Sequence, residues 1–130
     1  MKFGLFGLHR GANTDPDVLV RRARLTEDAG FESLWLGDHI MLPFGEQAIP
    51  ALPADQPRLE VVVGLGYLAA VTSTIRLGLG VIVLPQRQPV LLAKQLTTVD
   101  VLSRGRLIVG IGVGYLEPEL ESLGASLADR

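Results

Sequence analysis

Short apolar runs alternate along the chain with segments whose apolar residues recur at helical spacing. Runs rich in Leu, Ile and Val are typical of strands buried in a parallel sheet, whereas apolar residues three and four positions apart indicate the buried face of a helix. The expected strands lie at 2–7, 32–37, 75–84 and 106–112, and the expected helices at 16–29, 59–72 and 89–102. This alternation predicts a parallel sheet covered by helices.

Helix boundaries are marked by residues with known terminal preferences. Asp15 and Pro16 supply an N-cap and a first-turn proline, and Gly30 stands where a helix commonly ends. Pro89 and Gly105 mark the two ends of the last long helix in the same way. A further short helix is expected at 118–123.

The segment 38–58, between the second strand and the second helix, has no periodic pattern and contains four prolines. Loops of this length inside compact domains are commonly functional lids or disordered segments. We therefore expect it to lie over the carboxyl ends of the strands and to be mobile when no cofactor is bound.

Two α/β architectures compete for this pattern. A doubly wound nucleotide-binding sheet needs Gly-x-Gly-x-x-Gly after its first strand, and that motif is absent there. The glycines at 110–114 fail on spacing, because the third glycine of the motif would have to stand at position 115, which is Tyr115. A (β/α)₈ barrel needs roughly 250 residues. The 130 residues therefore predict an α/β fold of the TIM-barrel type with only its first four βα units, as one domain over 1–130.

Composition narrows the classes of function. The net charge is −2 and no basic run occurs, which argues against a nucleic-acid partner. The longest apolar stretch, 61–71, is shorter than the ~20 residues of a membrane-spanning helix, and residues 1–11 lack the features of a signal peptide. The absence of cysteine excludes disulfides and thiolate metal ligands. We expect a cytoplasmic protein without a metal site that binds a small-molecule substrate and no membrane.

Five segments, in order and at family spacing, resemble the luciferase-like monooxygenase family. They are GFESLWLGDH at 30–39, TIRLGLGV at 74–81, LPQRQPVLLAKQ at 84–95, DVLSRGRL at 100–107 and GIGVGY at 110–115. Each motif alone is weak, but the ordered series covers nearly the whole chain. The stretch at 84–90 is most similar to the branch that uses the deazaflavin coenzyme F420.

The resemblance implies a barrel that binds coenzyme F420, or alternatively FMN, at the carboxyl ends of its strands. Hydride or oxygen would then pass to a small organic substrate. The matched motifs imply that His39 is the catalytic residue and a cofactor contact, and that Gly80, Val81 and Gly112 are further cofactor contacts. The family also implies a cis peptide bond between Gly80 and Val81.

Most other polar residues near the strand ends are expected to have structural roles. Asp38 is expected to be structural and to orient His39, and His9 and Trp35 are interpreted as structural residues. Arg87 either binds an anionic group or is an exposed loop residue. The carboxylates at 117, 119 and 121 are not expected to converge, because their spacing of two does not bring them together. Tyr115 occupies the place where some deazaflavin enzymes carry a glutamate.

Alternatives to the enzyme remain open. The chain is also compatible with a non-catalytic half-barrel that dimerises or acts as a scaffold, and with a phosphate-binding half-barrel of another metabolic enzyme. Cofactor phosphates are usually held by loops after the later strands, so this chain alone is expected to lack part of the site. The open edges of the first and fourth strands, and inward residues such as Leu34, Leu36 and Val81, predict a homo-oligomer or a separate C-terminal half as partner.

Overall fold

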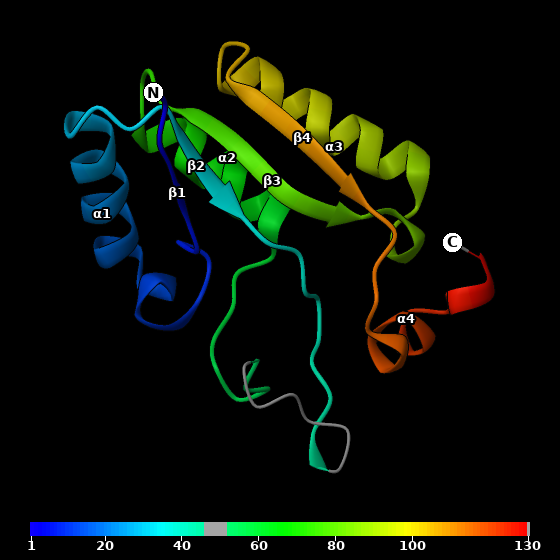
Figure 1. The fold of residues 1–130 in the computed structure, drawn as a ribbon. Coiled ribbons are helices and arrows are strands. Elements are labelled where there is room, and N and C mark those ends of the chain that lie inside the picture. Colours follow the sequence, from blue (N-terminus) through cyan, green and yellow to red (C-terminus); the bar gives the residue numbers. More distant parts are fainter. Residues whose placement is uncertain (46–51, 130) are drawn as a thin grey trace.

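Helices cover one face of a parallel sheet, and the other face is open (Figure 1). The computed structural model describes residues 1–45 and 52–129, and within them the sheet has four strands. The strands are β1 (Gly4–Phe6), β2 (Ser33–Leu36), β3 (Arg76–Val83) and β4 (Leu107–Gly112). The helices are α1 (Pro16–Asp28), α2 (Val61–Val71), α3 (Pro89–Leu102) and the short α4 (Glu117–Ser122), with 3₁₀ turns at Gly11–Thr14, Leu84–Gln86 and Leu127–Asp129. The predicted order of elements is confirmed.

The strands lie side by side in chain order, and each pairs in parallel with the next. This is the order of strands in a closed βα barrel, whereas a doubly wound sheet reverses its order at a switch point. The pairing of β3 with β4 is irregular between Leu79 and Ile82. Within this irregular stretch the peptide bond between Gly80 and Val81 is cis, as the family resemblance implies.

The hydrophobic core lies between the sheet and the three long helices. Its strand residues, each at most 1% exposed, are Leu34, Leu36, Leu77, Leu79 and Ile82. The helices contribute residues such as Leu19, Leu65 and Leu92. Gly64 weakens α2 as a helix but allows close packing, because a Cβ there would lie 3.4 Å from Cδ1 of Leu36.

The open face of the sheet carries residues that the core does not cover. Phe6 is 52% exposed and Val81 is 40% exposed. The expectation that Leu34 and Leu36 also point to this face is wrong, because both are buried in the core beneath the helices. The physical reason is the two-residue alternation of a strand, which places Trp35 on the open side and its neighbours on the helix side.

Arg106, directly before β4, joins the amino-terminal end of the sheet to α2. Its guanidinium donates hydrogen bonds to the carbonyl oxygens of Ala69, Thr72, Ile75 and Ser103 at 2.7–3.1 Å. It also donates to the Thr72 hydroxyl at 2.8 Å. One side chain therefore satisfies several backbone acceptors at the end of α2, where a helix leaves its last carbonyl groups without internal partners.

The loop expected at 38–58 leaves β2 at the end of the sheet opposite Arg106, and its central residues, 46–51, lie outside the described part of the chain. The last residues of the loop lie beside the segment that follows β1. The Leu59 amide donates to the His9 carbonyl at 2.8 Å, and the Gly11 amide donates to the Pro57 carbonyl at 2.9 Å. Among the residues described, we find no helix with the length and apolar character needed to cross a membrane.

Candidate active site

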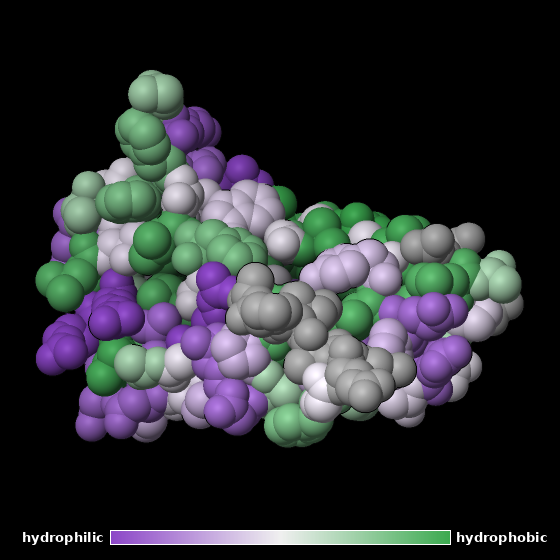
Figure 2. Space-filling model, turned by 60° about the horizontal axis from the view of Figure 1, so that its bottom comes forward, coloured by the Kyte–Doolittle hydropathy of each residue, from purple (hydrophilic) through white to green (hydrophobic). Residues whose placement is uncertain are grey.

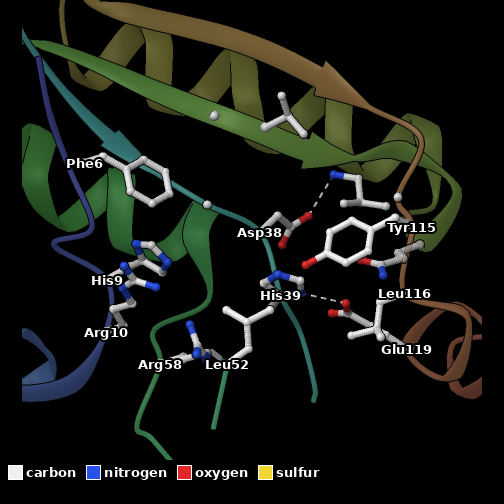
Figure 3. A pocket seen from close by; sticks show the side chains of 16 residues that line it. Phe6, His9, Arg10, Asp38, His39, Leu52, Arg58, Tyr115, Leu116 and Glu119 are labelled. Carbon is white, nitrogen blue, oxygen red and sulfur yellow. Dashed lines mark hydrogen bonds and ion pairs between the residues drawn. The ribbon is translucent and has the colours of Figure 1, made fainter. Parts of the chain in front are cut away.

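A pocket of about 330 Å³ lies at the carboxyl ends of the strands (Figure 3). Residues that follow each strand line it, which agrees with the usual place of sites in parallel α/β sheets. The lining includes His9 after β1, His39 after β2, Gly80 and Val81 within β3, and Tyr115 after β4. Figure 2 views the molecule from this side and shows apolar and hydrophilic residues intermixed. The lining of the pocket itself combines apolar and polar side chains, so it can hold an apolar body with polar groups at its edges.

His39 is held by a carboxylate from the other end of the chain. Its Nδ1 lies 2.8 Å from Oε2 of Glu119, on α4, and the two side chains are 16% and 2% exposed. The other carboxylate oxygen, Oε1, accepts from the backbone amides of Ile40 at 2.6 Å and Met41 at 3.3 Å. Glu119 thus fixes both the imidazole ring and the backbone that follows it.

The ionisation of Glu119 decides which ring nitrogen of His39 carries a proton. Burial alone would raise the pKa of this carboxyl, but the hydrogen bond and charge of His39, with the amides of Ile40 and Met41, hold that pKa below its ordinary value. The carboxylate is therefore ionised at neutral pH and can only accept. Nδ1 of His39 must donate, which leaves Nε2 as the ring nitrogen available to a ligand.

This pair corrects one expectation. Asp38 does not orient the His39 ring; Glu119 does, a role that was not expected of it. A sequence signal for Glu119 exists: it lies between Leu116 and Leu120, at spacings of three and one, on the buried face of α4. A carboxylate among such neighbours must find a partner, because an unpaired buried charge is costly.

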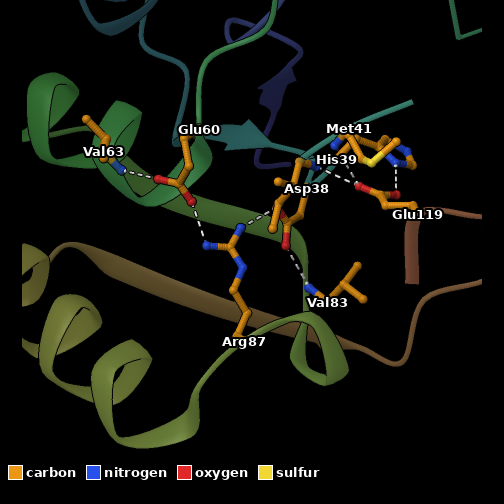
Figure 4. Close-up of polar contacts among 9 residues, drawn as sticks. Asp38, His39, Met41, Glu60, Val63, Val83, Arg87 and Glu119 are labelled. Carbon is orange, nitrogen blue, oxygen red and sulfur yellow. Dashed lines mark hydrogen bonds and ion pairs between the residues drawn. The ribbon is translucent and has the colours of Figure 1, made fainter. Parts of the chain in front are cut away.

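Asp38 instead joins the ends of β2 and β3 (Figure 4). Its Oδ2 accepts from the Val83 amide at 3.0 Å, and its Oδ1 accepts from Nη2 of Arg87 at 2.6 Å. Arg87 also donates to Glu60, the N-cap of α2, at 2.6 Å. The Arg87 side chain is 11% exposed, so it is not an exposed loop residue, and both of its terminal nitrogens are engaged by carboxylates of the chain. Asp38 is structural, as expected, but through this network.

Of the three further residues expected to contact the cofactor, two line the pocket and one does not. Gly80 and Val81 line the pocket, and a Cβ on Gly80 would lie 3.4 Å from Cε3 of Trp35. Gly112 is not among the residues that line it, and a Cβ there would collide with Cγ2 of Val81. Gly112 makes room for Val81, which in turn reaches the pocket. Gly78 accommodates the Trp35 ring in the same way.

His9 is buried, at 3% exposure, and lines the pocket beside Phe6. The two ring centroids are 5.8 Å apart in an edge-on arrangement. Burial, followed by the charges of Arg10, Arg58 and His39, lowers the pKa of His9 to about 4. The ring is therefore neutral at pH 7. Its Nδ1 has no hydrogen-bond partner among the described residues, so this buried polar atom can serve a ligand.

Comparison with known proteins extends the structural argument. The family model described as luciferase-like monooxygenase matches residues 1–130. Limonene 1,2-monooxygenase of Rhodococcus erythropolis is 38% identical over 100 residues, covering 77% of this chain and 23% of that enzyme. The chain spans only 39% and 31% of the length of the first curated relatives that it matches.

Solved structures agree with this assignment. The coenzyme F420 dependent tetrahydromethanopterin reductase of Methanopyrus kandleri has a TM-score of 0.69 at 25% identity, covering 97% of this chain and 30% of that chain. The oxygenating constituent of 3,6-diketocamphane monooxygenase of Pseudomonas putida, solved with FMN, has a TM-score of 0.73 at 21% identity, covering 100% and 34%. The fold is thus part of a TIM-type barrel, as predicted, and the chain belongs to the luciferase-like monooxygenase family.

Proposed function

We propose that the pocket binds the ring of coenzyme F420, with FMN as the alternative, and that His39 is the catalytic residue of an oxidoreductase acting on a small organic substrate. The observation that carries this proposal is the His39–Glu119 pair in a pocket at the carboxyl ends of the strands. A fixed imidazole with one free nitrogen is suited to hydrogen bonding or proton transfer near neutral pH.

The residues present fit a planar ring with polar edges. Gly80 exposes backbone rather than a side chain to the pocket, and a Cβ there would meet the rings of Trp35 and Phe6 at 3.4 and 3.9 Å. Nδ1 of His9 is buried without a described partner, which is the kind of polar atom that a ligand satisfies. The surrounding protein supplies binding, orientation and electrostatics to such a group.

A bound flavin or deazaflavin supplies the capacity to accept or donate a hydride. The chain's own contribution is the placement of protons and the exclusion of water. Nε2 of His39 accepts a proton or hydrogen bond at the pocket, while the Glu119 carboxylate stabilises the imidazolium that results. Phe6, Val81 and Leu116 provide apolar walls that limit the access of water.

The preference for coenzyme F420 rests on the motif at 84–90 and is supported by the likeness to an F420-dependent reductase. The likeness to a monooxygenase solved with FMN keeps FMN as the alternative. Transfer of hydride without oxygen would accompany the first cofactor, and oxygen transfer the second. The chain covers a minor part of the length of its relatives. The activity and the substrate of the whole protein are therefore part of what we propose.

Direct titration tests the proposal. The chain is titrated separately with F420 and FMN, and binding is followed by quenching of cofactor fluorescence. We expect His39→Ala to weaken binding about tenfold, the value of one hydrogen bond of ~1.4 kcal/mol. Lys94→Ala, an exposed position on α3, is the matched control and should bind as the parent does. Tighter binding of FMN would replace F420 in the proposal.

One further outcome would overturn the enzyme proposal. If neither cofactor binds at millimolar concentration, the non-catalytic half-barrel becomes the better account. The exposed apolar residues of the open face and of β4, such as Phe6, Val81 and Ile111, favour that alternative as a surface for a second copy. A fall in cofactor affinity that is equal in His39→Ala and Lys94→Ala would separately remove His39 from the site.

A further inference from the structure

The β1 side of the pocket carries two arginines that the proposed chemistry does not use. Arg10 follows β1 and Arg58 ends the long loop, and both line the pocket. The backbones of Arg10 and Arg58 pair in an isolated antiparallel bridge, so the two arginines lie on adjacent segments of the chain. Figure 3 shows His9, Arg10 and Arg58 together on one side, with Tyr115 and Glu119 on the other. Like charges placed this way repel each other.

The carboxylates of the pocket are engaged by other groups than these arginines. Glu119 is engaged by His39 and two backbone amides, and Asp38 by Arg87 and the Val83 amide. Both carboxylate side chains are at most 2% exposed. No carboxylate in residues 1–45 or 52–129 forms an ion pair with Arg10 or Arg58. The accessible charge on this side of the pocket is therefore positive.

Polar hydrogen-bonding atoms are left over at the same place. Nε of Arg58 is buried and has no partner among the described residues, and the same is true of Nδ1 of the buried His9. The described contact of the Arg58 guanidinium is a single hydrogen bond of 3.3 Å to Oε1 of Gln56. Arg10 lies with its guanidinium carbon 5.9 Å from the centroid of the Phe6 ring. Buried polar atoms without partners are uncommon in proteins, and a ligand in the pocket can satisfy them.

The electrostatics of Arg58 are compatible with an anionic ligand. Burial and the charge of Arg10 lower the pKa of Arg58, while the charges of Glu119 and Tyr115 act in the opposite direction, and an arginine remains charged at any physiological pH. An anion between the two groups would relieve their repulsion. Guanidinium groups bind carboxylate and phosphate oxygens with two parallel hydrogen bonds, which gives both affinity and orientation.

We infer that Arg10 and Arg58, with His9 beside them, form a subsite for an anionic group, a carboxylate or a phosphate, on the substrate of the proposed oxidoreductase. The inference rests on the proposed function for the role of that ligand as substrate. The subsite lies across the pocket from Glu119, with His39 between. A substrate anchored there by its anionic end would present its other end to Nε2 of His39.

The test compares ligands that differ only in charge. The chain is titrated with hexanoate, hexanamide and hexyl phosphate, and binding is followed by calorimetry and by the fluorescence of Trp35, which is the single tryptophan. We expect hexanoate or hexyl phosphate to bind at least about tenfold more tightly than hexanamide. The order of the two anions identifies which anionic group the subsite prefers.

Variants locate the effect. Arg58→Gln and Arg10→Gln should each abolish most of the preference for the anion, whereas Arg58→Lys should retain part of it. Arg21→Gln, an exposed position on α1, removes the same charge elsewhere and should retain all of it. Circular dichroism establishes that each variant is folded, and the comparison of ligands in the unaltered chain does not depend on any variant.

The possible outcomes separate this inference from the proposed function. Equal binding of hexanoate and hexanamide, or equal losses in Arg58→Gln and Arg21→Gln, would overturn the anion subsite. If F420 or FMN still binds in that case, the proposed function stands. If the anion preference is present but neither cofactor binds, the proposed function fails, and the ligand's role as a substrate fails with it.

Discussion

Replacing Glu119 by Gln should reverse the protonation of the His39 ring while preserving the fold. In the parent chain an ionised carboxylate accepts from Nδ1 at 2.8 Å. A glutamine in the same place keeps one oxygen for the amides of Ile40 and Met41 and turns an NH₂ group toward the ring. Nδ1 must then accept, and the proton moves to Nε2, because a neutral imidazole has one donor and one acceptor. The nitrogen facing the ligand changes from acceptor to donor.

The energetic cost follows from the contacts that remain. Hydrogen bonds to a charged group contribute ~1.5–3 kcal/mol and neutral ones ~0.5–1.5 kcal/mol. Glu119→Gln retains the same number of partners in neutral form, so we expect it to lower the free energy of unfolding by about 1–3 kcal/mol. Glu119→Ala removes every hydrogen bond that the Glu119 carboxylate accepts, at a residue that is 1% exposed. We therefore expect a larger decrease in the free energy of unfolding, of about 3–5 kcal/mol.

Long-range ¹H–¹⁵N correlation spectra of the imidazole rings measure the tautomer directly. The chain has two histidines, so the two rings can be assigned with a His9→Gln variant. The exposed Glu121→Gln on the same helix is the control and should leave His39 in the parent tautomer. An unchanged His39 tautomer in Glu119→Gln, with both proteins folded, would show that Glu119 does not set the state of the ring.

Three further outcomes are expected. Asp38→Asn should lower the free energy of unfolding in urea by about 1.5–3 kcal/mol, because it removes one of the two charge partners of Arg87 and leaves only the more exposed Glu60; Asp28→Asn, exposed on α1, should cost less than ~0.5 kcal/mol. The folded-state pKa of His9, about 4 against an ordinary 6.5, means that protonation favours the unfolded chain, so stability should fall as pH drops from about 6.5 to 4. This fall should be smaller in His9→Gln, and equal pH profiles would contradict it. Sedimentation at micromolar concentration should show an oligomer, because Phe6, Val81 and Ile111 are exposed, and a cooperatively melting monomer would contradict that expectation.

The elements were predictable from the sequence because their signals are local. The helix that follows Asp15 begins as expected, since the Asp15 side chain accepts from the amides of Asp17 and Val18 at 3.0 Å. The first strand is shorter than the run at 2–7, and it ends at Phe6 because Gly7 takes a φ of 106° that a continuing strand cannot adopt. Such end effects depend on backbone geometry that an apolar pattern does not contain.

The partners of the site residues were not predictable in the same way. Asp38 and Arg87 are 49 positions apart, and His39 and Glu119 are 80 apart. Nothing in the spacing of residues along one strand or helix shows which carboxylate will meet which base. The motif of the family located His39 at the pocket, but only the contact of α4 with the residues that follow β2 showed that Glu119, rather than the adjacent Asp38, holds the ring.

Asp38 and Glu119 therefore position His39 in different ways. Asp38 fixes the backbone at the end of β2 through Val83 and Arg87, so its loss should appear mainly as lost stability. Glu119 fixes the ring itself, so its neutral substitute should appear mainly as a changed tautomer and a changed ligand preference. If Asp38→Asn left stability intact but altered the His39 tautomer, this division would be wrong, and the ring would be controlled through the backbone of β2. The pair of variants thus distinguishes a histidine positioned by its own side-chain contact from one positioned by the strand that carries it.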